Sequence, residues 1–247
     1  MKLVICEKPS VAKAVASALG VTSRADGCFE GNGLIVSWCV GHLVSPMDAA
    51  GYDPGYKKWK YDDLPILPEP FRYVLAKGKE DAFQNLRHLM EREDVTELVN
   101  ACDAGREGEL IFRLVYEMAG CQKPFSRLWI SSMEDTAIRE GFNNLRPGAE
   151  YDPLYQSALC RQKADWLIGI NATRLFSVLY HRTLNVGRVQ TPTLAMLVER
   201  DSKITMFRKE KCHHVRLTLG GAEAVSEKIA APEEAEALRA ACAGAEA

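Results

Sequence analysis

KLVICEKPSVAKAVASALG, residues 2–20, is the stretch that decides the fold. Residues 2–6 form a short apolar run with β-branched side chains, which is typical of a buried strand. Residues 11–19 carry apolar side chains at helical spacing and stop at Gly20, and Ser10 is placed to cap that helix. The stretch therefore predicts a strand, a loop and a helix in that order.

The same alternation returns later in the chain. Residues 97–101 are predicted as a buried strand, 106–118 as a helix, 127–130 as a strand, and 132–143 as a helix that starts with a capping box. Strands separated by helices favour a mostly parallel sheet, so we expect a Rossmann-like α/β domain. Residues 46–70 are rich in Pro, Gly, Tyr and Lys and are predicted as a long excursion from the sheet.

The chain changes character near residue 150. Two prolines and a glycine make 144–153 the best boundary candidate, and 154–180 have an almost uninterrupted helical pattern. A second helix is predicted over 193–199, and Pro192 can begin it. The α/β domain should therefore be followed by a mainly helical one.

Composition excludes several classes of protein. The 247 residues contain 47% hydrophobic and 26% charged residues, which is enough to bury a substantial core. No apolar run approaches the ~20 residues that span a bilayer, and the amino terminus lacks a signal-peptide layout, so we expect a cytoplasmic protein with no membrane partner. The eight cysteines include no CxxC pair and indicate neither a zinc ribbon nor a disulfide framework.

Charge is unevenly distributed along the chain. The net charge of −2 combines about −4 for residues 1–150, +6 for 151–216 and −4 for 217–247. Screening over ~8–10 Å makes nearby charges count most, so the middle block can attract a polyanion. A solvated basic helix surface explains the same pattern equally well.

Acidic residues follow two of the predicted strands. Glu7 comes directly after the first, and Asp103, Glu107 and Glu109 follow the strand over 97–101. If the strands are neighbours, Glu7, Asp103 and Glu107 converge at the carboxyl edge of the sheet, and carboxylates so close favour a hard cation such as Mg²⁺. The alternative is that Asp103 and Glu107 are separate charges that stabilise a helix start.

Several motifs occur in the order found in one family. They are Glu7-Lys8-Pro9-Ser10, Gly41-His42-Leu43, Trp59 before Leu64-Pro65-Ile66-Leu67-Pro68, Asp103-Ala104-Gly105-Arg106-Glu107-Gly108-Glu109, the run RQKADWLIG over 161–169, and NVGRVQTPTL over 185–194. Over roughly residues 1–210 the chain resembles the type IA DNA topoisomerases, most closely the topoisomerase III branch.

The resemblance implies a domain plan and a substrate. It assigns a Toprim domain to 1–150, a helical DNA-binding domain to 151–211, and a truncated start of the arch domain to 212–247. It implies single-stranded DNA as the partner, Mg²⁺ as the cofactor and no nucleotide cofactor, and it leaves the oligomeric state open.

The resemblance also implies roles for single residues. Glu7, Asp103 and Glu107 resemble the family's metal-binding acids, and Glu7 and Lys8 resemble the catalytic residues beside the scissile phosphate. Gly105 stands where many relatives have a second aspartate, so a metal oxygen should come from water or from Glu109.

A second group resembles the family's DNA-binding residues, namely Arg161, Asp165, Arg174, Arg188 and Gln190. Without the resemblance, Arg161 and Asp165 are four apart on one helix and predict a modest surface ion pair.

The family's nucleophile is missing. Strand cleavage in this family uses a tyrosine followed by an Arg-Thr-Asp run, and none of the eight tyrosines has that context. We therefore expect an amino-terminal part of a longer topoisomerase that does not cleave DNA alone. The alternatives are a Toprim nuclease or primase, or a non-catalytic DNA-binding module.

Overall fold

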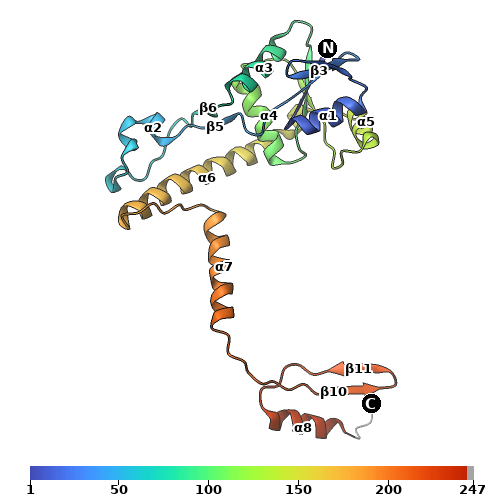
Figure 1. The fold of residues 1–247 in the computed structure, drawn as a ribbon, viewed down its shortest axis with the longest axis vertical. Coiled ribbons are helices and arrows are strands. Elements are labelled where there is room, and N and C mark those ends of the chain that lie inside the picture. The colour runs from blue at the N-terminus through green and yellow to red at the C-terminus, as the bar shows by residue number, and fades with distance from the viewer. Residues whose placement is uncertain (244–247) are drawn as a thin grey trace. The chain divides into compact units, whose positions relative to one another are not determined.

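The computed structural model describes residues 1–243, and its amino-terminal part is built on a seven-stranded sheet (Figure 1). The strands lie in the order β2-β3-β4-β1-β7-β8-β9. Their bounds are Lys2–Cys6 (β1), Ser23–Ala25 (β2), Cys28–Gly31 (β3), Leu34–Trp38 (β4), Glu97–Ala101 (β7), Phe125–Arg127 (β8) and Arg146–Pro147 (β9). The central strands β4, β1, β7 and β8 are parallel and the outer pairs are antiparallel, which confirms the predicted α/β class.

Strand β1 occupies the middle of the parallel group. It pairs with β4 on one side and with β7 on the other, and its last residue, Cys6, lies opposite Trp38 and Ala101. Parallel neighbours end at the same edge of a sheet. The residues that follow β1 and β7 therefore leave the sheet side by side.

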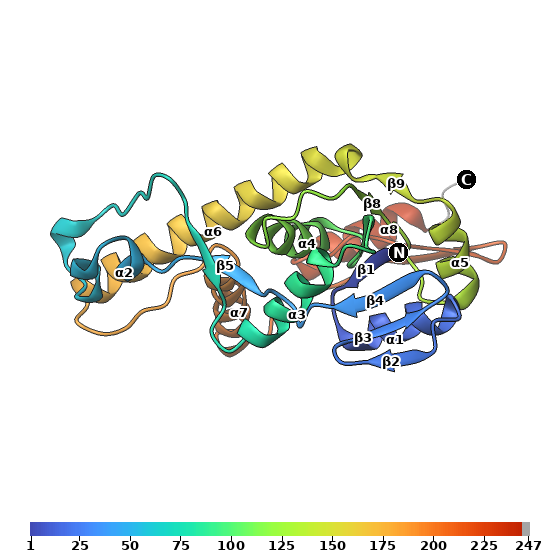
Figure 2. The ribbon, with the colours of Figure 1, turned by 90° about the horizontal axis from the view of Figure 1, so that it is seen from above.

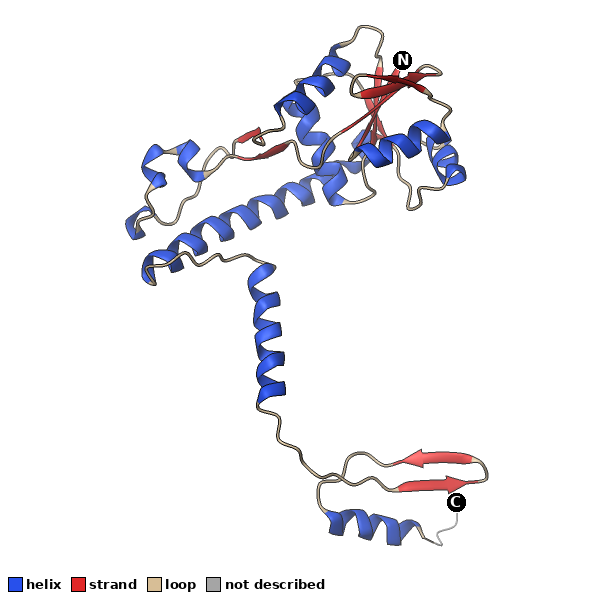
Figure 3. Ribbon diagram, in the orientation of Figure 1, coloured by secondary structure: helices blue, strands red, loops and turns tan. Residues whose placement is uncertain are grey.

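Helices cover both faces of this sheet (Figure 3). Alternate residues of β1 divide between the faces, as the pleat requires, with Val4 in one apolar cluster and Leu3 and Ile5 in the other. One cluster contains residues of α1 and α5, and the other contains residues of α3 and α4. These helices span Pro9–Ala18 (α1), Glu80–Glu91 (α3), Arg106–Met118 (α4) and Asp135–Asn143 (α5).

The predicted excursion leaves the sheet between β4 and α3, and we define it as residues 44–75. Its ends form a two-stranded antiparallel ladder of β5, Val44–Pro46, and β6, Tyr73–Leu75. Between them lie α2, Ala49–Tyr52, and two 3₁₀ turns over Pro54–Lys57 and Tyr61–Asp63. This ladder was not expected from the sequence, because three-residue strands carry too little periodicity to detect.

A long helix, α6, spans Asp152–Leu179 and runs from α4 to the excursion (Figures 1 and 2). Near its start, Tyr155 and Ala158 are buried in the cluster that contains α4. Further along, Asn171 binds the backbone of Ile66 twice, donating to its carbonyl at 3.0 Å and accepting from its N–H at 2.6 Å. The helix thus joins the α/β layer and the excursion into one compact unit, residues 1–191.

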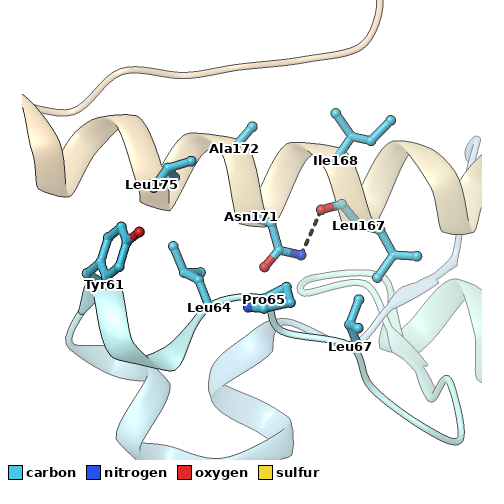
Figure 4. A pocket seen from close by; sticks show the side chains of 9 residues that line it. All are labelled: Tyr61, Leu64, Pro65, Leu67, Leu167, Ile168, Asn171, Ala172 and Leu175. Carbon is cyan, nitrogen blue, oxygen red and sulfur yellow. Dashed lines mark hydrogen bonds between the residues drawn. The ribbon is translucent and has the colours of Figure 1, made fainter.

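An open apolar hollow of about 540 Å³ lies where the excursion meets α6 (Figure 4). Leu64, Pro65 and Leu67 from the excursion face α6, and Asn171 lies between the two sides. The Asn171 amide also donates to the Leu167 carbonyl at 2.9 Å, so its hydrogen bonds go to the backbone. This amide is therefore already used in holding the excursion.

Residues from Pro192 onward form a second compact unit. Helix α7, Gln190–Thr205, leads into it, and a hairpin of β10, Arg216–Leu219, and β11, Ala222–Val225, is followed by α8, Pro232–Cys242. No helix within residues 1–243 is long and apolar enough to cross a membrane.

Helix starts were predicted less well than the helices themselves. Helix α1 has Lys8 as its N-cap and Pro9 at the first helical position, so Ser10 lies inside the helix and does not cap it. The Ser132 hydroxyl accepts from the Glu134 N–H at 3.3 Å, a bond that precedes α5 and makes no capping box. Strand β8 lies two residues earlier than the expected strand over 127–130.

Candidate functional site

The site is built where β1 and β7 end. Glu7 follows β1 and Asp103 lies two residues beyond β7, and their carboxyl groups interact directly. The backbone holds both positions: the Glu7 carbonyl accepts from the Gly41 N–H at 3.2 Å, and the Asp103 carbonyl accepts from Arg127 Nη2 at 2.6 Å. The predicted convergence of these two acids is present.

The surroundings of the Glu7 carboxyl disfavour its charged form. Its pKa is raised above the ordinary glutamate value, first because burial disfavours the charge and second because Asp103 lies beside it. Lys8 lowers the pKa in part. Lys8 therefore does not fully offset the effects of burial and of Asp103 on the charged form of Glu7.

Glu107 lies in the first turn of α4, and its carboxylate pairs with side chains other than Glu7 and Asp103. Its two carboxyl oxygens pair with His42 Nε2 at 3.5 Å and with Arg161 Nη1 at 3.3 Å. Within residues 1–243 no three side chains among His, Cys, Asp and Glu are close enough to hold a metal ion as they stand. The structure therefore brings together two of the three predicted metal ligands and pairs Glu107 with His42 and Arg161 instead.

The ion pairs continue along α6. Arg161 Nε lies 3.6 Å from Asp165 Oδ2, and Arg188 Nε donates to Asp165 Oδ1 at 2.5 Å. Asp165 thus fixes two guanidinium groups that lie on separate segments of the chain. A polar hollow of about 350 Å³ includes His42, Glu107, Arg161 and Asp165 in its lining.

A second hollow, of about 440 Å³, is lined by three arginines, Arg106, Arg161 and Arg188, together with Ala164. Sequence reasoning named Arg161 and Arg188 but missed Arg106, which stands at the first position of α4 and is exposed. Its place between Asp103 and Glu107 in one short motif was the signal available. Three guanidinium groups around one opening suit a phosphate backbone.

Two other predicted residues of the DNA-binding group lie in different settings. Gln190 is the exposed first residue of α7. Arg174 is 4% exposed, donates to the Tyr56 carbonyl at 2.8 Å and lies over the Trp59 ring. The prediction that Arg174 contacts DNA is corrected, because its guanidinium is buried and holds the excursion against α6.

Glu109 is also corrected as a possible source of a metal oxygen. The residue is completely buried and pairs with Arg113 at 2.9 Å and with Arg127 at 3.1 Å. Its helix carries it into the core while Glu107, two residues earlier, stays at the surface. A carboxylate with two buried arginine partners has no reason to turn toward a metal ion.

The remaining donor set still fits a divalent cation. Glu7 and Asp103 offer adjacent carboxylates, the donor type that Mg²⁺ prefers, and Mg²⁺ commonly takes one or two carboxylates and keeps several waters. Burial is the first cause of the raised pKa of Glu7, and the second, repulsion from Asp103, is one that a cation between the two carboxylates would offset. The third carboxylate is not needed for such a site.

Fold and site together define an α/β protein with an acidic sheet edge beside two exposed arginines, Arg106 and Arg188, and the half-buried Arg161. Residues 2–133 match the family model of the Toprim domain, and residues 149–247 match the model described as DNA topoisomerase. The Toprim match covers more than half of the chain. The chain belongs to the Toprim family.

Curated relatives agree with this assignment. The chain is 44% identical over 219 residues to DNA topoisomerase 3 of Bacillus subtilis (strain 168) and 45% identical over 214 residues to DNA topoisomerase 3 of Shouchella clausii (strain KSM-K16). These alignments cover 89% and 87% of the chain but only 30% and 29% of the relatives. The predicted resemblance to the topoisomerase III branch is confirmed, and the chain spans about a third of such a protein.

A solved structure shares the fold. Full-length topoisomerase I from Thermotoga maritima superposes with a TM-score of 0.61 at 23% identity, covering 96% of this chain and 37% of that one. At this identity the likeness concerns the fold, and the roles of single residues must be argued from the site.

The raised pKa of Glu7 predicts how the acid pair affects stability. A carboxyl that holds its proton more tightly when folded makes stability fall as pH rises from the ordinary glutamate pKa, about 4.3, to the raised value. Glu7→Gln should therefore raise the melting temperature at pH 7 and lose this advantage below about pH 3.5.

Thermal melts of both proteins at the two pH values measure this effect. Glu93→Gln, which changes an exposed glutamate after α3, is the control and should change neither melt. A lower melting temperature for Glu7→Gln at pH 7 would contradict the account.

The position of Arg174 gives a second prediction. Arg174→Met leaves the Tyr56 carbonyl without its donor and should reduce the free energy of unfolding by about 1–3 kcal/mol. Affinity for single-stranded DNA should change less than about twofold, because the guanidinium is not exposed to phosphates. Denaturant unfolding and fluorescence anisotropy measure the two quantities, and a loss of DNA affinity at unchanged stability would restore the original prediction.

Proposed function

We propose that this chain supplies the Toprim part and an adjoining helical part of a type IA topoisomerase that cleaves and reseals single-stranded DNA through a tyrosyl-phosphate, with Mg²⁺ and without ATP. The observation that carries the proposal is the acid pair Glu7 and Asp103, at the ends of neighbouring parallel strands, beside Lys8 and an arginine-lined hollow. The similarity to curated topoisomerases supports it.

Glu7 and Asp103 would hold the Mg²⁺ ion. Binding of Mg²⁺ is a general property of the Toprim domains of topoisomerases. When bound, the ion supplies positive charge that opposes the negative charge developing on phosphoryl oxygens. Glu107 would join through water or by exchanging its present partners, since it is the second residue of the helix that follows Asp103.

Lys8 would act on the scissile phosphate directly. It is exposed and occupies the N-cap position of α1, next to Glu7. An ammonium fixed beside a phosphodiester stabilises the charge of the transition state, and the partial positive charge of a helix amino terminus adds to it. Lys8 and Glu7 are therefore the proposed catalytic residues of this chain.

Arg161 and Arg188 would hold the DNA backbone, with Asp165 orienting both and Gln190 contributing a polar contact. Each arginine has its guanidinium at the surface and a carboxylate that limits its rotation. Such contacts position a strand without selecting its bases. Affinity should fall steeply with salt while sequence preference stays weak.

Residues 1–247 should bind single-stranded DNA without cleaving it. None of the tyrosines has the Arg-Thr-Asp context of the family's nucleophile, and Tyr155 is buried in the α4 contact. The match of residues 149–247 to the topoisomerase model favours this function over a Toprim nuclease or primase. When the chain is incubated with single-stranded DNA and Mg²⁺, we expect neither nicks nor primers.

The DNA-binding role of the surface arginines can be tested directly. Arg161→Ala should weaken binding of a single-stranded oligonucleotide by about tenfold at low salt. It should also make the negative slope of the logarithm of the association constant against the logarithm of the salt concentration shallower by about 0.7. Its melting temperature should change little, because exposed ion pairs contribute at most about 1 kcal/mol.

Arg87→Ala is the matched control, because Arg87 is an exposed arginine of α3 that also pairs with a carboxylate four residues away. It should leave DNA affinity unchanged. Equal losses of affinity in the two variants would mean that binding follows net charge only, and nicking by the wild-type chain would favour the nuclease alternative.

A further inference from the structure

A buried guanidinium donates to the backbone of Asp103. Arg127, the last residue of β8, is completely buried, and its Nε pairs with the equally buried Glu109 at 3.1 Å. Burial lowers the pKa of Arg127, while the Glu109 carboxylate favours its charged form. A buried pair of this kind costs desolvation energy and is seldom retained for stability alone.

Arg127 also donates to the Leu128 carbonyl at 3.1 Å, and its other backbone hydrogen bonds go to the chain segment that ends in Asp103. Nη1 donates to the carbonyls of Asn100 at 3.0 Å and Cys102 at 2.7 Å, and Nη2 donates to the Asp103 carbonyl at 2.6 Å. One planar group thus fixes three peptide units between β7 and the acid. Asn100 supports the same segment, since its side chain accepts from the Cys102 N–H at 3.1 Å and donates to Glu109 at 3.0 Å.

Helix α4 also packs closely against the Asp103 peptide, through Gly108. A Cβ at Gly108 would lie 2.1 Å from the Asp103 carbonyl oxygen, closer than any side chain permits. Glycine at this position lets the helix touch the backbone of Asp103. The Asp103 peptide is therefore confined by Gly108 and by Arg127 at once.

A neighbouring arginine shows what a purely structural member of this network does. Arg113 is nearly buried and pairs with the same Glu109, but it donates to the Gly148 carbonyl at 2.8 Å and pairs with Asp152 at 2.7 Å. It joins α4 to the start of α6, and within residues 1–243 its hydrogen bonds and ion pairs go to Glu109, Gly148 and Asp152, not to the Asp103 segment. Two arginines on one carboxylate thus hold two different parts of the molecule.

We propose that Arg127, oriented by Glu109, is a positioning residue that sets the distance between the Asp103 and Glu7 carboxylates. The inference rests on the proposed function, because that distance matters for a shared divalent cation. Gly41 fixes Glu7 from the β4 side and Arg127 fixes Asp103 from the β8 side, so the two acids are held by opposite flanks of the sheet.

The test compares Arg127→Lys with Arg113→Lys in the 247-residue chain. Lysine keeps the charge beside Glu109 but cannot hold the three carbonyls in one plane. Arg127→Lys should raise the Mn²⁺ dissociation constant, measured by electron paramagnetic resonance, by about tenfold or more. It should speed amide hydrogen exchange at Cys102, whose buried N–H donates to Asn100 Oδ1, by a similar factor. Arg113→Lys should lose comparable thermal stability yet leave both quantities within about twofold.

Gly108→Ala provides a second variant that removes no polar group. It should displace the Asp103 peptide and weaken Mn²⁺ binding while the Arg127–Glu109 pair stays intact. If Arg127→Lys does not fold, this variant alone tests whether the position of the Asp103 peptide controls Mn²⁺ binding. Equal effects of the two lysine variants, or no effect of Arg127→Lys or Gly108→Ala on exchange, would overturn the proposal. If the wild-type chain binds no Mn²⁺, the proposed metal site fails, and the exchange measurement alone still decides the positioning role.

Discussion

The parallel pairing of β1 with β7 is the constraint on which the site depends. Its register sets Cys6 opposite Ala101, so the chain segments carrying Glu7 and Asp103 leave the sheet at one edge and cannot be moved apart without breaking the ladder. Burial and the neighbouring Asp103 both disfavour the ionised form of Glu7 and raise its pKa. The sheet and the bonds to both backbone segments maintain an arrangement that side-chain electrostatics alone would oppose.

Charged residues fall into two groups with different physical roles. Arg127, Arg113 and Arg174 are buried or nearly so and donate to backbone carbonyls, which stabilises the segments that carry the site. Arg161 and Arg188 remain at the surface and share one carboxylate. Within the positively charged block over residues 151–216, the charge of Arg174 is thus structural, while the charges of Arg161 and Arg188 are at the surface, where a polyanion can reach them.

The sequence predicted the elements that have strong periodicity and missed what depends on tertiary contacts. Strand β1 and helix α4 have the predicted bounds, because apolar spacing and flanking breakers define both. No pattern distinguishes Arg174, which lies inside, from Arg161, which lies outside on the same helix, because the excursion that buries Arg174 comes from a hundred residues earlier. Glu107 and Glu109 likewise belong to one motif, yet helical geometry sends them to opposite environments.

The central claim is that Glu7 and Asp103 share one divalent cation. The most direct measurement is paramagnetic broadening of amide resonances by substoichiometric Mn²⁺ in the wild-type chain and in Asp103→Asn. The account predicts that broadening is centred on residues 7–8 and 103–105 and disappears in the variant. Broadening centred on other acidic residues, such as Asp62 and Asp63 of the excursion, or broadening unchanged by Asp103→Asn, would contradict it.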